Sequence, residues 1–346
     1  MSEKRIRINL NQQNYPSDCT YRWAGEEISD YCIRLCENKD KYGITYKDIA
    51  KLMNAETGNQ YGESAYRKEF TAFNRGRIYE REHSVVAVHN RILAISDMHV
   101  PFHYPVDIFS QYSGNVDTLV LNGDIMDCQS ISSFPKKYRI NFIDEMKEAR
   151  QYLIDIIELV KPNKVYITKG NHEHRMLKYL TDKVNDDLLN LMPDSPMDLI
   201  INDGFKDNDR FKRVEKYYPP LKKEFAEQGI EIRYDGNWYC RVGNVIFAHP
   251  LAYSSPMMKT ADRAVTFFSR TMNRDFSAIV MAHTHKVGFY KVGDIKMYEQ
   301  GCVCRLEELD YADGKLQIPQ QNGYMYISLD KDGNIIEDKT KLITEL

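Results

Sequence analysis

Five short apolar runs in this chain each lead into a residue that can bind a metal ion. The runs are four to six residues long and rich in Val, Ile and Leu, with Gly, Asn or Asp at their ends, a pattern typical of buried β-strands. They are Arg91–Ser96, Thr118–Asn122, Val165–Thr168, Val245–Ala248 and Ala278–Ala282. Because a buried strand carries polar residues mainly where it emerges, we expect these ends to gather along one edge of a sheet and to form one site.

The side chains at these ends are suitable ligands for a pair of metal ions. Carboxylate oxygens, imidazole nitrogens and an amide oxygen together suit borderline ions such as Mn²⁺, Fe, Zn²⁺ or Co²⁺. Their number exceeds what one tetrahedral ion needs, so the sequence predicts two ions about 3.5–4 Å apart that share a bridging carboxylate. The candidate ligands are Asp97, His99, Asp124, Asn171, His249, His283 and His285.

The order of these blocks resembles a known family. Asp-x-His, Gly-Asp-x-x-Asp, Gly-Asn-His-Glu, a later His and His-x-His follow one another from Ile92 to His285, as in the calcineurin-like metallophosphoesterase superfamily. One departure is Ala282, where many members have Gly, a small-for-small change. The resemblance implies that Asp124 bridges the two ions. The first ion would be held by Asp97, His99, Asp124 and His285, and the second by Asp124, Asn171, His249 and His283.

The resemblance gives His172 a separate role, because the His of Gly-Asn-His-Glu in that family sits over the scissile phosphate and does not bind metal. Two cations would lower the pKa of a bridging water and polarise the phosphoryl oxygens, which permits in-line attack by hydroxide. An imidazole with a pKa near neutrality can protonate the leaving oxygen, so His172 is the predicted general acid. Asp127 and Glu173 are predicted to support the site without touching metal. His174 and Arg175 could face substrate phosphate, although a charged residue that opens a helix is more often solvated surface.

Length and composition agree with an enzyme of one large and one smaller domain. The chain has 346 residues, of which 42% are hydrophobic, and a formal net charge of −3, which gives no global sign of nucleic-acid binding. No apolar run approaches the ~18–20 residues that span a bilayer, and the N-terminus lacks the apolar core of a signal peptide. The seven cysteines match no strong zinc pattern. We therefore expect a cytoplasmic protein with reduced thiols and no membrane contact, and the oligomeric state stays open.

Residues 1–83 are predicted to form a small helical domain. Ala24–Cys36 and Thr45–Asn54 show helical spacing of apolar residues, and a third helix is expected at about Glu63–Arg77. Three short helices resemble a helix-turn-helix module. The connection at Ala55–Gly62 is longer than the tight turn of the common motif.

The third helix of this domain has the composition of a nucleic-acid reader. Within Ser64–Tyr79, four basic side chains against the single acidic Glu69 give a net charge of +3, and aromatic residues are interleaved with them. The basic residues are Arg67, Lys68, Arg75 and Arg77. The alternative is a plain helical bundle that packs on the hydrolase or makes a dimer.

Residues 84–346 are predicted to form the hydrolase domain, an α/β fold in which helices flank a two-layered β-sandwich. Strands expected at Val287–Val292, Ile295–Gly301 and Tyr324–Asp330 would complete it, with a polar loop at residues 305–321.

An insertion at about residues 193–237 is predicted to cap the metal cleft. The stretch from the third to the fourth metal block is longer than a simple crossover requires. It is expected to contain a helix at Met176–Met192, a polar loop at Asp203–Arg210 and a charged helix at Phe211–Gln228 that is broken by Pro219-Pro220.

Together these features predict a two-metal phosphoesterase that cleaves phosphodiester bonds. A DNA-directed nuclease is the first choice, because a helix-turn-helix module would place the cleft on a polymer and the superfamily includes repair nucleases. Mn²⁺ is the expected metal, with Fe, Zn²⁺ and Mg²⁺ as alternatives. The second choice is a small-molecule phosphoesterase acting on a nucleotide, dinucleotide or cyclic nucleotide, with the N-terminal helices used for oligomerisation. A DNA-binding regulator with a relic metal site is a third reading, against which the intact ligand set argues.

Overall fold

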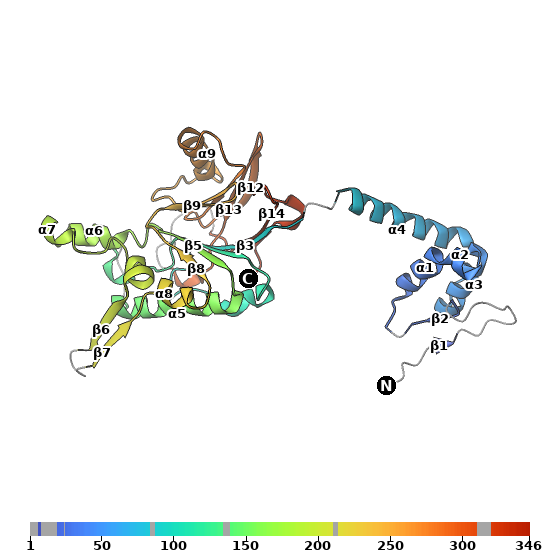
Figure 1. Cartoon of the computed structure of the whole chain (residues 1–346). Helices are drawn as coiled ribbons and strands as arrows, with labels where there is room; N and C mark the ends of the chain where they lie inside the picture. The colour runs from blue at the N-terminus through green and yellow to red at the C-terminus, as the bar shows by residue number, and fades with distance from the viewer. Residues whose placement is uncertain are drawn as a thin grey trace. The chain divides into compact units, whose positions relative to one another are not determined.

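The computed structural model describes residues 6–7, 19–23, 25–83, 87–133, 139–209, 214–309 and 320–346. The chain divides into two compact units, Met1–Val85 and Val86–Leu346 (Figure 1). The predicted domain boundary, between residues 83 and 84, falls at the edge of the described residues, because residues 84–86 lie outside them. Within the described ranges, no helix has both the length and the apolar character needed to cross a membrane.

The first unit is a small helical bundle. Side chains from α1, α3 and α4 share one core, in which Tyr31, Ile49 and Tyr66 are buried. Helix α3 begins with a capping box, in which the side chains of Thr45 and Asp48 each accept a hydrogen bond from the backbone N–H of the other. The elements are β1 (Ile6–Arg7), β2 (Tyr21–Arg22), α1 (Ile28–Glu37), α2 (Lys39–Tyr42), α3 (Tyr46–Thr57) and α4 (Glu63–His83).

The second unit is an α/β fold. Its strands are β3 (Asn90–Ile95), β4 (Thr118–Asn122), β5 (Lys164–Thr168), β6 (Phe205–Asp209), β7 (Val214–Tyr218), β8 (Glu231–Arg233), β9 (Tyr239–Val242), β10 (Val245–Ala248), β11 (Ala278–Met281), β12 (Val287–Val292), β13 (Ile295–Gln300), β14 (Tyr324–Leu329) and β15 (Lys341–Ile343). Its α-helices are α5 (Phe142–Val160), α6 (Arg175–Thr181), α7 (Asp186–Leu189), α8 (Leu221–Ala226) and α9 (Lys259–Thr271). Short 3₁₀-helices are η1 (Val106–Tyr112), η2 (Gln129–Ile131), η4 (Leu306–Glu308) and η6 (Glu337–Lys339), and η3 (Asp198–Asp203) is a π-helix.

The strands form two main sheets. One has the order β15-β14-β3-β4-β5-β8 and the other β12-β13-β11-β10-β9. Strands β3, β4 and β5 are parallel neighbours in the first sheet, and β10 and β11 are parallel neighbours in the second. The five apolar runs are therefore strands, as predicted, but they belong to two sheets and not to one edge of a single sheet.

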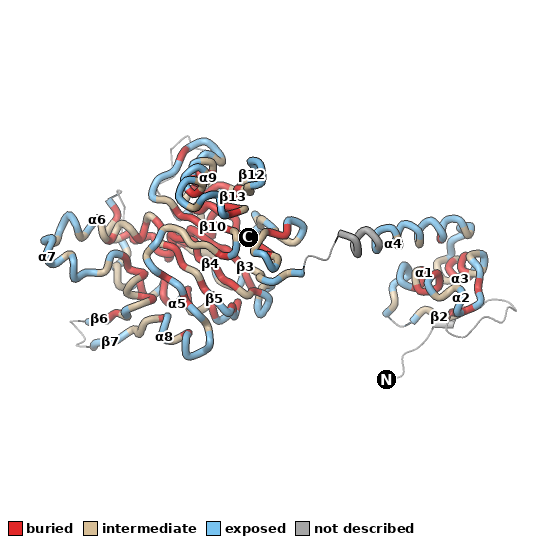
Figure 2. Tube along the Cα trace, turned by 45° about the horizontal axis from the view of Figure 1, so that its top comes forward, coloured by how far each residue is buried: buried red, intermediate tan, exposed pale blue. Residues whose placement is uncertain are grey.

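Successive side chains of each strand pack in different cores, as the pleat of a strand requires. In β3, Leu93 packs beneath α5, whereas Ile92 lies in the core between the sheets. In β10, Ile246 packs against α9, whereas Phe247 lies between the sheets. Figure 2 shows these strands as largely buried. The predicted two-layered β-sandwich with helices on its outer faces is confirmed, and so are the strands expected after the last metal block.

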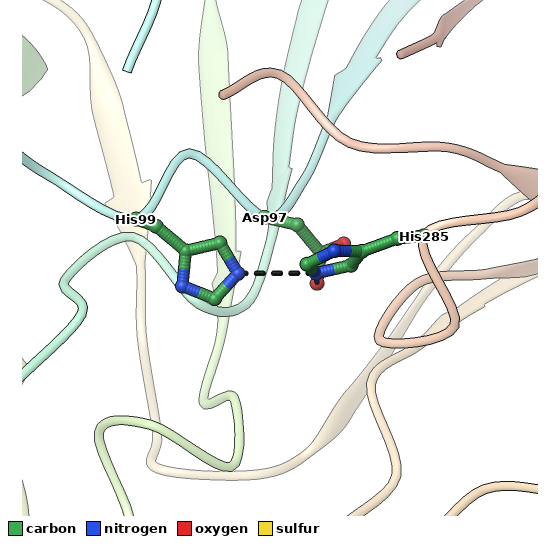
Figure 3. Close-up of side chains that lie close together, drawn as sticks. All are labelled: Asp97, His99 and His285. Atoms are coloured by element: carbon green, nitrogen blue, oxygen red, sulfur yellow. Dashed lines mark hydrogen bonds and ion pairs between the residues drawn. The ribbon is translucent and has the colours of Figure 1, made fainter. Parts of the chain in front are cut away.

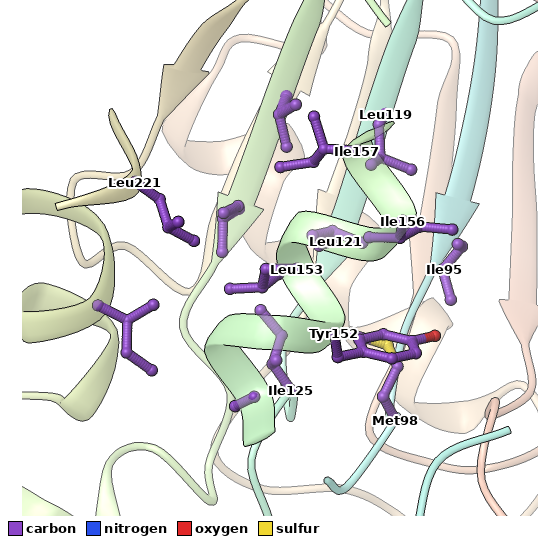
Figure 4. Close-up of a cluster of buried hydrophobic side chains, with 14 of the residues drawn as sticks. Ile95, Met98, Leu119, Leu121, Ile125, Tyr152, Leu153, Ile156, Ile157 and Leu221 are labelled. Atoms are coloured by element: carbon purple, nitrogen blue, oxygen red, sulfur yellow. The ribbon is translucent and has the colours of Figure 1, made fainter. Parts of the chain in front are cut away.

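Helix α5 covers the outer face of the six-stranded sheet. The side chain of Asn141 accepts a hydrogen bond from the backbone N–H of Ile143 at 3.1 Å and caps the first turn. Leu153, Ile156 and Ile157 recur at helical spacing and are fully buried against the sheet (Figure 4). This packing holds the strands whose ends carry the candidate ligands.

The segment between β5 and β8 differs from the prediction. The helix expected at Met176–Met192 is divided into α6 and α7. The polar loop expected at Asp203–Arg210 is largely strand β6, which pairs antiparallel with β7. Within the helix expected at Phe211–Gln228, the described residues form strand β7 and become helical only in α8, after Pro220. Residues 210–213, and residues 310–319 of the expected loop at 305–321, lie outside the described part of the chain.

Cross-strand pairs explain the hairpin of β6 and β7. The rings of Phe205 and Tyr218 stack with centroids 4.8 Å apart, and Lys206 lies 2.6 Å from Glu215 as an ion pair. Pairs of these kinds stabilise antiparallel strands. The charges that resemble a loop or a helix in the sequence therefore lie on the solvated face of a hairpin.

Candidate metal centre

The loops after β3 and β11 form the first group of candidate ligands. Ligand atoms of Asp97, His99 and His285 lie within 4.8 Å of one another, and all three residues are buried. The Nε2 atom of His285 is 3.1 Å from Oδ1 of Asp97 and 3.1 Å from Nε2 of His99. Figure 3 shows the three side chains pointing toward one another.

The loops after β4, β5, β10 and β11 form the second group. Ligand atoms of Asp124, His249 and His283 lie within 4.8 Å of one another. The Nε2 atom of His249 is 3.2 Å from Oδ2 of Asp124 and 3.0 Å from Oδ1 of Asn171. All seven predicted ligands are thus brought together, four from one sheet and three from the other.

Asp124 lies between the two groups. Its Oδ2 atom is 3.2 Å from Nε2 of His249 in the second group and 3.9 Å from Nε2 of His99 in the first. Ligand atoms of His99, Asp124 and His172 also lie within 4.8 Å of one another. The geometry is therefore the one that a bridging carboxylate needs, and bridging by Asp124 stays a prediction.

Five candidate ligands have a left-handed backbone. The φ angles are 53° at Asp97, 49° at His99, 50° at Asp124, 72° at His283 and 50° at His285. Non-glycine residues in this region cost about 1–3 kcal/mol each and persist where the surrounding structure over-determines them, which is common at functional sites. The sharp turns aim the ligands back over the ends of the strands.

Burial and mutual charge set the protonation of the cluster. Burial acts to raise the pKa of Asp97, but His249 and His285 hold it at about 2. Burial lowers the pKa of His99 to about 4 and that of His283 to about 3. Both of these imidazoles are therefore neutral at pH 7, which is the form that binds a metal ion.

The residues fit a pair of divalent cations. Two buried imidazole nitrogens, Nε2 of His99 and Nε2 of His285, face each other at 3.1 Å, and they can form a hydrogen bond only if one carries a proton. Among the described residues, the buried Nε2 of His283 has no hydrogen-bond partner, a situation that costs about 1–3 kcal/mol. A cation bound by Nε2 of His99 and Nε2 of His285 would remove the need for a proton between them. A cation bound by Nε2 of His283 would give that atom a partner. Two carboxylates, one amide and four imidazoles suit such ions.

Glu173 ties two ligand loops together. Its Oε2 atom accepts hydrogen bonds from the backbone N–H of Asp124 at 3.1 Å and of Gly170 at 2.9 Å, and its Oε1 atom accepts one from the N–H of Met126 at 2.9 Å. Burial, together with the charge of Asp124, raises the pKa of Glu173 to about 7. Glu173 therefore holds the backbone of the two loops that carry Asp124 and Asn171.

Asp127 lies behind two histidines. Its Oδ1 atom is 3.0 Å from Nδ1 of His172 and 3.4 Å from Nδ1 of His99. The Nη1 atom of Arg175 donates to the carbonyl oxygen of Asp127 at 2.6 Å, and Nη2 lies 2.9 Å from Nε2 of His172. Because Nδ1 of His172 faces Asp127, its Nε2 faces the centre, and the guanidinium of Arg175 converges on the same point.

Asn122 is a residue that the sequence reasoning missed. Its carbonyl oxygen is 2.8 Å from Nδ1 of His249, and its side-chain amide donates to the carbonyl oxygens of Ala248 and Val280 at 3.4 and 3.3 Å. Its Oδ1 atom accepts a hydrogen bond from Thr168 at 3.0 Å. Asn122 therefore orients one ligand and connects strands of both sheets. The available signal was an amide at the last position of an otherwise apolar strand.

The remaining predicted residues are His174 and the basic residues of α4. Within the described residues, no hydrogen bond or ion pair joins the side chain of His174 to the seven candidate ligands, and Nδ1 of His174 has no partner. The predicted nucleic-acid contacts belong to α4 of the first unit, where all of them are exposed. They are Arg67, Lys68, Arg75 and Arg77.

Replacement of Gly170 by Ala should weaken metal binding at least tenfold. A Cβ atom at Gly170 would meet the backbone nitrogen and Oδ1 of Asp124 far inside contact distance, so the Asp124 carboxylate must move. Changes around metal ligands typically cost 10–100-fold in affinity. Calorimetric titration with Mn²⁺ measures the change. Gly62→Ala is the control, because no atom lies within 4 Å of its added Cβ, and equal affinity of the two variants would contradict the placement of Asp124.

Comparison with known proteins adds two family matches. Residues 90–287 match the model of the calcineurin-like phosphoesterases, and residues 17–85 match the model of the YonJ N-terminal domain. The chain is 46% identical over 65 residues to the SPbeta prophage-derived uncharacterized protein YonJ of Bacillus subtilis (strain 168). That alignment covers 19% of this chain and 16% of the relative, so the chain spans about one sixth of the relative's length.

The solved structures that the comparison matches have low sequence identity to this chain. Vacuolar Protein Sorting 29 from Cryptosporidium parvum is 13% identical, with 75% of this chain and 100% of that chain covered and a TM-score of 0.35. Vps29 of Entamoeba histolytica, solved in complex with zinc, is 14% identical, with 74% and 98% covered and a TM-score of 0.33. An archaeal phosphodiesterase is 16% identical, with 74% and 99% covered and a TM-score of 0.30.

Proposed function

Because the chain belongs to the calcineurin-like phosphoesterase family, we propose that it hydrolyses phosphodiester bonds of DNA with two divalent metal ions. The observation that carries this proposal is the convergence of the candidate ligands in two buried groups that Asp124 joins. Mn²⁺ is the metal we propose, because oxygen and imidazole donors are mixed in both groups. Fe, Zn²⁺ and Mg²⁺ are the alternatives to be compared.

When bound, the cations would supply Lewis acidity, which activates water and withdraws charge from the phosphoryl oxygens. His172 would hold the proton for the leaving oxygen at Nε2, because Asp127 lies 3.0 Å from Nδ1 and fixes the other side of the ring. In this structure Nη2 of Arg175, which can only donate, lies 2.9 Å from Nε2 of His172, so Arg175 would move to a phosphate oxygen when Nε2 carries the proton. A guanidinium suits phosphate because it offers two parallel N–H donors.

The proposed preference for DNA rests on the first unit. The described basic residues of α4 named above are exposed, as phosphate contacts require. Two of them also make contacts within the unit: Arg67 lies over the ring of Tyr46, with its guanidinium carbon 5.3 Å from the centroid, and Arg77 forms an ion pair with Glu37. The unit matches a family model of its own, which supports its use as a separate targeting module.

The insertion at about residues 193–237 is proposed to line the approach to the centre.

The test is hydrolysis of single-stranded DNA, double-stranded DNA and a panel of mononucleotides by the purified chain with added Mn²⁺. Cleavage of DNA is the expected result. Turnover of nucleotides alone would support the second candidate, a small-molecule phosphoesterase whose N-terminal helices serve oligomerisation. Each metal ion is compared at equal concentration after removal of bound metal with a chelator.

The role of the first unit is tested by deletion of residues 1–80. We expect the truncated chain to lose activity on DNA and to keep its activity on bis(p-nitrophenyl) phosphate, because only the polymer needs the basic helix. In the full chain, the double variant Lys68→Gln, Arg75→Gln should reduce the slope of log affinity for DNA against log salt by about two, roughly one for each lost phosphate contact. Equal loss on both substrates, or no loss on either, would contradict recruitment by the first unit.

A further inference from the structure

The segment that follows His249 exposes large apolar side chains next to the metal centre. Leu251 is 54% exposed, Tyr253 45% and Met257 45%. Single exposed apolar side chains are common on protein surfaces, but three within one short segment that follows a candidate metal ligand favour a surface that contacts a ligand. The segment begins one residue after a candidate metal ligand, so whatever it contacts lies close to the reacting phosphate.

Tyr253 reaches the rim of the centre itself. The centroid of its ring is 5.2 Å from that of His283, with 67° between the ring planes. The edge-to-face contact fixes one side of the tyrosine against a candidate ligand. Almost half of the residue stays accessible, so the ring stands beside the centre with surface available for another group.

Buried polar groups hold this segment in place although it has no regular secondary structure. The Nζ atom of Lys286, a residue only 4% exposed, donates hydrogen bonds to the carbonyl oxygens of Ser254 at 3.2 Å and Ser255 at 2.6 Å. The carboxylate of the fully buried Glu299 accepts a hydrogen bond from the N–H of Met258 at 3.1 Å. The backbone on the C-terminal side of Tyr253 is therefore anchored. An anchored aromatic side chain loses little conformational entropy when a ligand stacks on it.

We propose that Tyr253 is the stacking platform for a nucleobase next to the scissile phosphate. This inference rests on the proposed function and adds how the substrate is positioned. A base has a flat π face, and stacking on an aromatic side chain stabilises a bound base by about 1–3 kcal/mol without regard to its identity. The Nζ atom of Lys286 lies 5.8 Å from the centroid of the same ring, a cation–π contact that helps to hold the ring in place.

The experiment uses the full chain with two single-stranded oligomers of equal length, an oligothymidylate and an oligomer of tetrahydrofuran abasic residues. The variants are Tyr253→Ala, Tyr253→Phe and Tyr253→Leu. We expect Tyr253→Ala to raise KM for the oligothymidylate by roughly 5- to 150-fold, which is the stacking contribution expressed as a ratio, with little change in kcat. Tyr253→Phe should behave as the unmodified chain. KM for the abasic oligomer should be the same in every variant.

Tyr253→Leu separates stacking from simple apolar contact, because it keeps apolar area and removes the ring. A KM for Tyr253→Leu equal to that of Tyr253→Phe would overturn the inference, and so would an equal effect of Tyr253→Ala on both oligomers. Bound metal is measured in each variant by elemental analysis, and loss of metal in Tyr253→Ala would show that the ring only shields His283. Cleavage of double-stranded DNA but of neither oligomer by the unmodified chain would overturn this inference alone, and cleavage of no DNA at all would overturn the proposed function with it.

Discussion

Replacement of Asp124 by Asn should remove both metal ions and lower turnover by about a thousandfold or more. Asp124 is the carboxylate that lies between the two groups of ligands, with Oδ2 3.2 Å from His249 and 3.9 Å from His99. The side-chain amide of Asn carries no charge and offers only one oxygen as a ligand. It therefore offsets none of the charge of the two cations. Metal ions contribute several kcal/mol to phosphoryl transfer, and about 4 kcal/mol corresponds to a factor of a thousand.

Elemental analysis of purified Asp124→Asn, beside phosphodiesterase assays at saturating Mn²⁺, measures both parts of this expectation. Asp187→Asn is a matched control, because Asp187 is an exposed residue of α7 away from the candidate ligands. Circular dichroism establishes that the variant is folded. Two ions retained by Asp124→Asn would contradict the bridging assignment, and one ion retained would place Asp124 in a single group.

Replacement of His172 by Ala should lower turnover by about 10²–10⁴-fold while both ions stay bound, because general acid catalysis contributes an effect of this size. Asp127 faces Nδ1 of His172 at 3.0 Å, and Nε2, which contacts Arg175 at 2.9 Å in this structure, is the nitrogen that we propose to serve the leaving oxygen. His174→Ala is the matched control, since it removes the same kind of side chain two positions away. We expect it to retain most activity.

The leaving group distinguishes a proton donor from other roles of His172. A nucleoside leaves as an alkoxide and needs a proton, whereas p-nitrophenolate is a stable anion. His172→Ala should therefore impair cleavage of a dinucleotide much more than cleavage of bis(p-nitrophenyl) phosphate. Equal losses on the two substrates would remove His172 from proton transfer. Loss of an ion would make it a ligand, as its position near Asp124 and His99 permits.

Much of the second unit could be predicted from local pattern. The strand ends that lead to Asp97 and Asp124 combine a continuous apolar run with an abrupt polar stop, and both features are encoded within a few residues. The convergence of the ligands was predicted from the position of each one after a buried strand, and the structure brings all seven together. What the pattern does not contain is which strands pair, because hydrogen bonding between strands is non-local. The division of the ligands between two sheets could not be predicted for this reason.

The remaining errors have the same physical origin. The hairpin of β6 and β7 depends on the contact of Phe205 with Tyr218 across the strands, and residues thirteen apart give no periodic signal. Asn122 was missed because a polar residue at a strand end resembles an ordinary turn residue. Its importance appears only when His249 and Thr168, far away in the sequence, are placed around it.

Because the candidate ligands come from two sheets, the geometry of the metal centre depends on the packing between those sheets. Asp97 and Asp124 move with one sheet, and His249 and His283 move with the other. Each group of candidate ligands combines residues from both sheets, so the distances within each group depend on the thickness of the core between the sheets. Residues such as Phe247, which is fully buried between the sheets, therefore act as spacers, and a change in their volume is expected to alter catalysis in a chain that is still fully folded.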